Sequence, residues 1–305
     1  MKTLEERVAR NRAFVVPDKI LVASDLADTD YLIPHAMAQA RACGAALTLL
    51  HVVPPAEAIP LDASAIPYMD EAAMQEEARQ ILESAATRVR DSGIPCDVMV
   101  LPGYPRDRVA AVAREIQAGR VLTGTHGRRH FKRILLGSVA HEILRTSPVP
   151  VCTIGPHAHE ASAFGAPRKI LHPVSLCEGY EDSAAIAMEL AQFYRADITL
   201  LHVLRFDAEH QQDAERIIEW TKSELKRIVP DEAPLWTRAT LQVETGDVVE
   251  ETLNVAAEMN ADLVVLGVNA DVSFWPIRGD DTVYSIIARA KSPVLSIRRN
   301  VETCL

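Results

Sequence analysis

The pentapeptide Thr48-Leu-Leu-His-Val52 recurs almost unchanged as Thr199-Leu-Leu-His-Val203. Three more pairs of segments match in the same order: Lys19 to Asp25 with Lys169 to Ser175, Gly103 to Gly124 with Gly246 to Gly267, and Ser147-Pro-Val149 with Ser292-Pro-Val294. The offsets between partners lie between 143 and 151 residues. Four ordered matches at similar offsets indicate that this chain of 305 residues is an internal duplication.

Each half alternates short apolar runs with segments of helical periodicity. In the first half the pattern predicts strands at 20–24, 47–53, 96–101, 121–123 and 149–154, and helices at 28–43, 71–92, 106–117 and 138–145. Gly44 and Gly93 are placed to end the first two helices. The second half repeats this order, so we expect an α/β fold in which parallel sheets carry helices on both faces.

Residues 157–168 are rich in Ala, Ser, Gly and Pro, which is typical of a linker. We therefore expect a first domain at 1–156 and a second domain at 169–305. Residues 1–13 resemble a short helical extension, and residues 54–70 resemble a loop over one face.

The composition restricts the classes of function. A hydrophobic fraction of 48% is that of a globular protein, and a net charge of −10 argues against extended nucleic-acid binding. No apolar run approaches the roughly 20 residues that cross a bilayer, and the charged segment Met1 to Arg12 does not resemble a secretory signal. The five cysteines are scattered without a CxxC pair, so we expect reduced thiols and a cytoplasmic protein without membrane contact.

The stretch that carries chemistry is Gly124-Thr-His-Gly127-Arg-Arg-His-Phe-Lys-Arg-Ile-Leu-Leu-Gly137-Ser138-Val139. It follows a predicted strand and leads into a predicted helix at Ser138, where free amides and the helix dipole favour an anion. Glycines allow backbone amides to approach phosphate oxygens closely. Four cations lie between the glycines of this acidic protein: Arg128, Arg129, Lys132 and Arg133. The pattern favours phosphate binding over a solvated glycine turn.

The spacing Gly, two residues, Gly, nine residues, Gly-Ser resembles the nucleotide-binding motif of the universal stress protein family. The resemblance covers Lys19 to Ile154 and Lys169 to Arg298. It implies an acidic residue on the adenosine side, at Asp25, and a backbone contact to adenine at Val52. His126 could also contact phosphate, because it lies between two of the glycines. The implied nucleotide-binding residues are Asp25, Val52, Gly124, His126, Gly127, Arg128, Gly137, Ser138 and Val139.

The resemblance also implies the fold: two tandem doubly wound domains, Rossmann-like and similar to adenine nucleotide alpha hydrolases, each with a five-stranded parallel sheet of order 3-2-1-4-5. Strands one and four are then neighbours, so Asp25 and Gly124 flank one crevice at the carboxyl ends of the strands. Family members pair through their last strands, here 149–154 and 294–298. We expect this pairing within the chain, and a homodimer is a further option.

The function implied is ATP binding, with Mg or Mn bridging phosphate oxygens, in a stress-response or regulatory role with an unknown protein partner. Any hydrolysis is expected to be slow, because no positioned general base is evident. Two alternatives remain open. One is an ATPase or nucleotide hydrolase that uses His126 or Asp25 as base, and the other is an interaction module with an unfilled pocket.

The second half departs from the motif. Ala270 replaces the second glycine, Asp280 takes the place of Ser138, and Ser175 replaces Asp25. Because Asp271, Asp280 and Asp281 would repel polyphosphate, we expect one nucleotide site, in the first half.

Two features of the first half also depart from the family, which often has Pro at Ala23 and an acidic residue near Gly119-Arg120. His51 and His202, at repeated positions, are interpreted as hydrogen-bonded strand-end residues rather than catalytic ones. His157 and His159 are two metal-ligand types in the linker, without a further ligand to complete a site.

Overall fold

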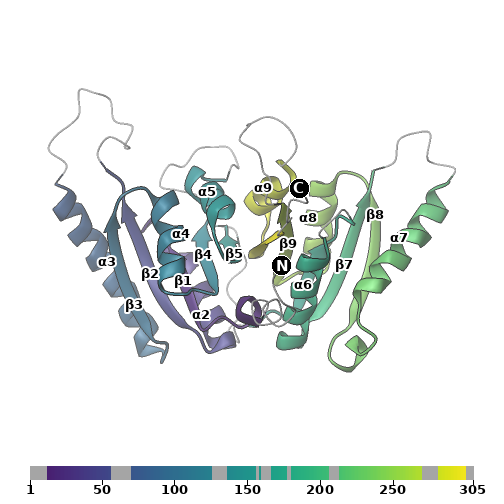
Figure 1. The fold of residues 1–305 in the computed structure, drawn as a ribbon, viewed down its shortest axis with the longest axis horizontal. Helices are drawn as coiled ribbons and strands as arrows, with labels where there is room; N and C mark the ends of the chain where they lie inside the picture. The colour runs from purple at the N-terminus through teal and green to yellow at the C-terminus, as the bar shows by residue number, and fades with distance from the viewer. Residues whose placement is uncertain are drawn as a thin grey trace, which may run out of the picture.

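The computed structural model describes residues 12–55, 70–125, 136–155, 158, 166–176, 180–205, 213–269 and 281–299. Within them, ten strands form one sheet of order β3-β2-β1-β4-β5-β10-β9-β6-β7-β8, with the first half on one side and the second half on the other (Figure 1). The first half therefore has the predicted order 3-2-1-4-5.

The elements of the first half match the predicted ones with boundaries shifted by one or two residues. Its strands are β1 (Lys19–Ala23), β2 (Ala46–Val53), β3 (Cys96–Pro102), β4 (Arg120–Gly124) and β5 (Val151–Ile154). Its helices are α2 (Thr29–Cys43), α3 (Glu71–Asp91), α4 (Pro105–Glu115) and α5 (Ser138–Thr146). Gly44 ends α2 as predicted, because it takes a left-handed conformation with φ of 73° and donates its N–H to Ala40 O.

The second half repeats this order. Its strands are β6 (Lys169–Pro173), β7 (Asp197–Leu204), β8 (Ala239–Thr245), β9 (Leu263–Asn269) and β10 (Val294–Arg299). Its helices are α6 (Tyr180–Tyr194), α7 (Ala214–Ile228), α8 (Val248–Glu258) and α9 (Asp281–Arg289), with a short 3₁₀ helix, η3 (Ala233–Leu235), before β8. None of the helices in the described ranges is long and apolar enough to cross a membrane.

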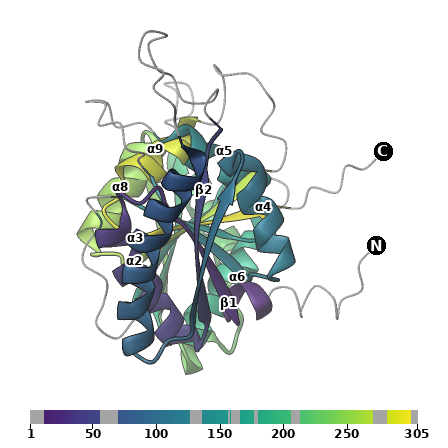
Figure 2. The same ribbon diagram turned by 90° about the vertical axis from the view of Figure 1, so that its left-hand side faces the viewer.

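Two buried cores lie on opposite faces of the sheet. The helices α2, α3, α6 and α7 cover one face, and α4, α5, α8 and α9 cover the other. Figure 2 shows this arrangement for the first half, with α2 and α3 on one side of the strands and α4 on the other. The central strand β1 is fully buried from Ile20 to Val22, which explains its unbroken apolar sequence.

The two halves join through their last strands, as predicted. β5 and β10 pair antiparallel, with Cys152 opposite Leu295 in the middle of the pairing. The helices α5 and α9 lie above this junction (Figure 1), where the rings of His141 and Tyr284 approach to 4.4 Å between centroids.

The predicted match of Ser147-Pro-Val149 with Ser292-Pro-Val294 is wrong by two residues. Val121 N–H donates to Pro150 O, and Val264 N–H donates to Pro293 O in the same place of the second half. The structural counterpart of Pro293 is therefore Pro150 and not Pro148. Accordingly, β5 begins at Val151 rather than at residue 149.

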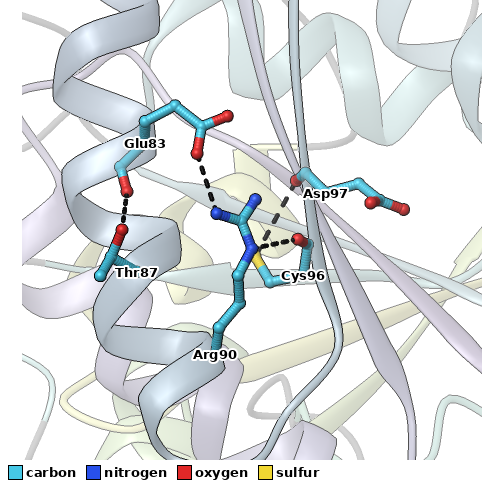
Figure 3. Close-up of polar contacts among 5 residues, drawn as sticks. All are labelled: Glu83, Thr87, Arg90, Cys96 and Asp97. Carbon is cyan, nitrogen blue, oxygen red and sulfur yellow. Dashed lines mark hydrogen bonds and ion pairs between the residues drawn. The ribbon is translucent and has the colours of Figure 1, made fainter.

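A side-chain contact holds α3 to the edge strand β3 (Figure 3). The guanidinium of Arg90 donates from Nη1 to Glu83 Oε2 at 2.9 Å and from Nε to the carbonyl of Cys96 at 2.8 Å. Burial of the thiol raises the pKa of Cys96 to about 11, so this cysteine is protonated at neutral pH. The cluster links a helix to a strand and needs no ligand to explain it.

The amino ends of β4 and β9 carry different residues at matching positions, Gly119 and Asp262. A side chain at the buried Gly119 would place its Cβ 2.5 Å from Ala13 O and 2.8 Å from Pro17 Cβ. At the same place in the second half, Asp262 is exposed and its Oδ2 accepts the N–H groups of Arg168 and Lys169. The missing acidic residue near Gly119-Arg120 thus follows from packing of residues 13–17.

Candidate functional site

The candidate site lies where β1 and β4 end side by side. The two strands are parallel, with Ala23 opposite Thr123, so the segments after Ala23 and Thr123 leave the sheet at the same edge. The chain continues to β2 on one side and to β5 on the other, which makes this the switch point of the first half. Ligands of doubly wound sheets bind at such a point. The predicted neighbours Asp25 and Gly124 lie within it.

A tight turn follows β1. Asp25 accepts the N–H groups of Ala27 and Asp28 on Oδ1, at 3.0 and 3.2 Å. Leu26 takes a left-handed conformation with φ of 74°, and its N–H donates to Ser24 Oγ at 3.0 Å. A left-handed leucine is strained, and such strain is kept where the surrounding contacts require it. These contacts fix the direction of Asp25 at the crevice.

Asp28 is a buried carboxyl at the centre of the site. It is 3% exposed, and Ser24 Oγ donates to its Oδ1 at 2.5 Å. Burial, with a smaller contribution from the nearby charge of Asp25, raises the pKa of Asp28 to about 7. Burial and the Asp28 charge also raise the pKa of the Tyr31 phenol. Near neutral pH the turn therefore contains a carboxyl group that is close to its own titration point.

Gly124 is in close contact with Asp28 and Tyr31. A Cβ at this position would lie 2.7 Å from Asp28 Oδ2 and 2.9 Å from Tyr31 Oη. No larger residue fits without moving these side chains, so the glycine is required by close approach. The contact couples the turn after β1 to the start of the glycine-rich loop.

The ends of the glycine-rich loop are held together by the backbone. Gly137 N–H donates to Thr125 O at 2.8 Å, and Thr125 N–H donates to Ile154 O at 3.0 Å. Gly137 is the residue immediately before α5. As a glycine it has no side chain that could cap the first turn of the helix. These bonds place the first turn of α5, which begins at Ser138, beside Gly124. Among the described residues no side chain caps this turn, so its amide groups can donate to an anion.

The other predicted residues fall into two groups. Val52 is 5% exposed near the end of β2, opposite Leu101 of β3, while Ser138 and Val139 are exposed in the first turn of α5. The structure thus brings together Asp25, Gly124, Gly137 and Ser138. His126, Gly127 and Arg128 lie outside the described residues, as do His157 and His159.

The repeated histidines have the structural role predicted for them. His51 Nδ1 bonds to Ser24 O at 2.8 Å, and His202 Nδ1 bonds to Val174 O at 2.7 Å. Each histidine ties the second strand of its half to the end of the first strand. Because the same hydrogen bond is present in both halves, we interpret it as part of the fold.

The corresponding position of the second half keeps the left-handed residue but not the carboxylate. Leu176 is again left-handed, with φ of 53°, after the exposed Ser175 that replaces Asp25. The substituted loop residues Ala270, Asp271 and Asp280 lie outside the described residues. The second half therefore offers no carboxylate at the position of Asp25.

Asp28 is the residue that sequence reasoning missed. Its signal was its spacing: it lies three residues after Asp25 and is the first residue of the predicted helix 28–43, where an acidic residue is normally interpreted as an ordinary helix cap. In the structure its side chain makes no cap bond to the helix and turns inward to Ser24 and Gly124 instead. The role of Asp28 follows from the burial of its side chain, and the spacing of residues in a sequence does not show which side chains are buried.

Comparison with known proteins agrees with the fold and with the duplication. The model of the Universal stress protein family matches the chain twice, at residues 17–154 and 167–298. Universal stress protein MJ0577 of Methanocaldococcus jannaschii is 27% identical over 81 residues, which are 27% of this chain and 50% of that protein. Universal stress protein YxiE of Bacillus subtilis is 27% identical over 145 residues, covering 45% of this chain and 98% of that protein.

A solved structure matches both halves together. The crystal structure of a universal stress protein from Archaeoglobus fulgidus superposes with a TM-score of 0.68 at 20% identity, over 92% of this chain and 96% of that one. The two family matches cover most of the sequence, one in each half of the continuous sheet. The chain belongs to the universal stress protein family, with two copies of the family's domain in tandem.

Proposed function

We propose that the first half binds one ATP, with Mg or Mn bridging its phosphate oxygens, and that the protein acts in a cytoplasmic stress response by presenting its nucleotide state to a protein partner. The observation that carries this proposal is the hydrogen bond from Gly137 N–H to Thr125 O. It holds the start of α5 beside Gly124, so that a helix N-terminus and a glycine face the same switch point.

The described residues fit an adenine nucleotide in this crevice. The open first turn of α5 supplies amide donors for phosphate oxygens, and Ser138 adds a hydroxyl there. Asp25 retains acceptor capacity on a carboxylate, which suits a ribose hydroxyl donor. Gly127, Arg128 and His126 complete the proposed phosphate contacts. Val52 supplies the proposed backbone contact to adenine, as the family pattern implies. When bound, the cation would offset the repulsion between the phosphate charge and the two nearby carboxyl groups, Asp25 and Asp28.

Binding would transmit information by shifting a conformational equilibrium. A nucleotide changes the populated state only if it binds one state more tightly than another. The exposed Val139 and the helix α5 lie beside the junction with α9, so the start of α5 links the crevice to the surface shared by the halves.

The first experiment identifies the ligand. The small molecules released on denaturing the purified protein would be analysed by mass spectrometry, and Mg-ATP would be titrated into the emptied protein by calorimetry. We expect an adenine nucleotide and about one site per chain. Two equivalent sites, or no binding of Mg-ATP, would contradict the proposal.

Two matched variants locate the site. Asp25→Asn keeps an acceptor for the Ala27 and Asp28 amides but removes the charge, so it should leave the turn folded and weaken ATP binding by about tenfold. Ser175→Ala alters the same place in the second half and should leave ATP affinity unchanged. If Ser175→Ala weakens binding as much as Asp25→Asn, the site does not belong to the first half.

A further inference from the structure

A cavity lies between the halves, at the amino ends of the strands. Its volume is about 290 Å³, at the lower end of the range of small-molecule sites. Arg120 of β4 and Leu263 of β9 line it, together with the paired residues Cys152 and Leu295 of the central strands. It is thus separated from the crevice described above by the length of β4.

The cavity contains a buried cation without a carboxylate partner. Arg120 is 3% exposed, and its Nη1 donates to Gln39 Oε1 at 2.8 Å while Nη2 donates to Phe14 O at 2.9 Å. Tyr194 also hydrogen-bonds to the guanidinium from the second half. In the part of the chain that the structure describes, Nε has no hydrogen-bond partner and no Asp or Glu pairs with Arg120. A buried charge without a counter-ion is costly, and an anion would offset that cost.

The fold itself does not need this arginine. Arg120 lies opposite Ile20 in the pairing of β1 with β4, and Leu263 lies opposite Ile170 in the pairing of β6 with β9. The same position of the repeated sheet therefore holds a cation in one half and an apolar residue in the other. Both residues line the one cavity.

The helices above the cavity show the same contrast. Gln39 is the eleventh residue of α2, and its counterpart, the eleventh residue of α6, is the fully buried Leu190. Gln39 and Arg120 thus give the cavity wall of the first half its polar character. The wall of the second half combines an apolar part, Ala261, Leu263, Pro293 and Leu295, with the polar residues Tyr194, Asn260, Asp262 and Ser292.

Two further ionisable residues, His35 and Asp262, line the cavity. His35 lines the cavity on the side of the first half and is 7% exposed. Asp262 also lines the cavity but is exposed, and its carboxylate already accepts two backbone N–H groups. Its side chain therefore lies at the solvent-exposed rim of the cavity.

We propose that this cavity binds a small organic carboxylate, with the carboxylate on Arg120 and a short apolar chain against Leu263, Pro293 and Leu295. In this position the ligand contacts both halves of the chain. The proposal does not depend on ATP binding, because the two sites lie at opposite ends of the strands.

The test is a titration of the full chain with butanoate and hexanoate, followed by calorimetry and thermal shift. Butanamide is the neutral comparison, and inorganic phosphate is the comparison for an anion without an apolar part. We expect the carboxylates to bind at least about tenfold more tightly than butanamide, because a charged partner of Arg120 is lost in the amide. Equal affinity of butanamide, binding of phosphate alone, or no binding of either carboxylate would overturn the proposal.

Three variants assign the site. Arg120→Leu introduces the residue type of the second half and should abolish carboxylate binding, while Arg41→Leu removes an exposed charge from the same face of the chain and should not. Ala38→Leu leaves Arg120 in place but fills part of the cavity, and should also abolish binding. If Arg120→Leu fails to fold, Ala38→Leu still decides: full binding in that variant would overturn the assignment to this cavity.

Discussion

The two halves of the chain share one fold and differ at both ends of their strands. At the carboxyl ends, the first half has Asp25 where the second half has the exposed Ser175. At the amino ends, the first half has Gly119-Arg120 where the second half has Asp262-Leu263. The strand order and the antiparallel junction are the same from either side.

The shared features teach which contacts the fold requires. Both halves keep a left-handed leucine after the first strand and a histidine that bonds to the strand end. Features present in only one half, such as the carboxylate of Asp25 or the buried Arg120, are not required by the sheet itself. These are the places where function is best sought.

The largest expected effect comes from placing the acidic residue of the second half in the first. Gly119→Asp would force a Cβ against Ala13 O and bury a carboxylate, so we expect a loss of about 4 to 5 kcal/mol in the free energy of unfolding. The reverse exchange, Asp262→Gly, loses two hydrogen bonds of an exposed group and should cost only about 1 kcal/mol.

The unfolding of the two halves can be measured with two different signals. All three tryptophans, Trp220, Trp236 and Trp275, lie in the second half, whereas circular dichroism reports both halves. Gly119→Asp should therefore shift the unfolding seen by circular dichroism more than that seen by tryptophan fluorescence. Equal shifts of the two signals would show that the halves unfold as one unit.

The next effect concerns Asp28 and pH. Its pKa is raised from 3.8 to about 7 in the folded state, so between these values the folded protein binds more protons than the unfolded chain. Stability should therefore fall as pH rises from about 4 to 7, by roughly 2 to 4 kcal/mol, and stay low above that range. Asp28→Asn keeps an acceptor for Ser24 and should remove this dependence, making the variant more stable than the wild type at pH 8.

The measurement is chemical denaturation from pH 4 to pH 8, followed by circular dichroism. Because the remaining carboxyl groups are unchanged, the difference between the two proteins isolates Asp28. A wild type and variant with parallel pH profiles would show that Asp28 does not titrate in this range.

The smallest effect distinguishes the helices α4 and α8. Asp247 caps α8 by accepting the N–H groups of Val249 and Glu250, whereas Tyr104 before α4 makes no side-chain cap bond. Asp247→Ala should cost about 1 kcal/mol, and Tyr104→Asp should gain about 0.5 kcal/mol. The melting temperatures of both variants, compared with the wild type, test this; a loss of stability in Tyr104→Asp would mean that the tyrosine ring contributes more than a cap.

Much of the fold could be predicted because the strands are continuous apolar runs and the helices end at clear signals. The buried run Ile20 to Val22 and the left-handed Gly44 are examples in which local sequence and final structure agree. The match of Pro148 with Pro293 failed because Ser-Pro-Val is too short to fix a register. Backbone bonds from Val121 and Val264 decided it instead.

The position of the candidate site in the fold could be predicted from the sequence, but the burial of its side chains could not. The strand order placed Asp25 near Gly124, since both follow neighbouring parallel strands. Asp28 could not be recognised, because an acidic residue before a helix has an exposed capping role in most proteins. The cavity around Arg120 was equally invisible, because its two walls come from positions 143 residues apart, Arg120 and Leu263.

The antiparallel junction has a consequence for symmetry. Cys152 faces Leu295 at its centre, and Arg120 and Leu263 occupy matching positions on either side, so the cavity straddles an approximate two-fold axis. In a dimer of two identical chains, any residue on such an axis appears twice, and two guanidinium groups would face each other across one small space. Joining both copies in one chain removes that restriction. A single positive charge can then stand opposite a leucine, which no symmetric pair of identical subunits can achieve.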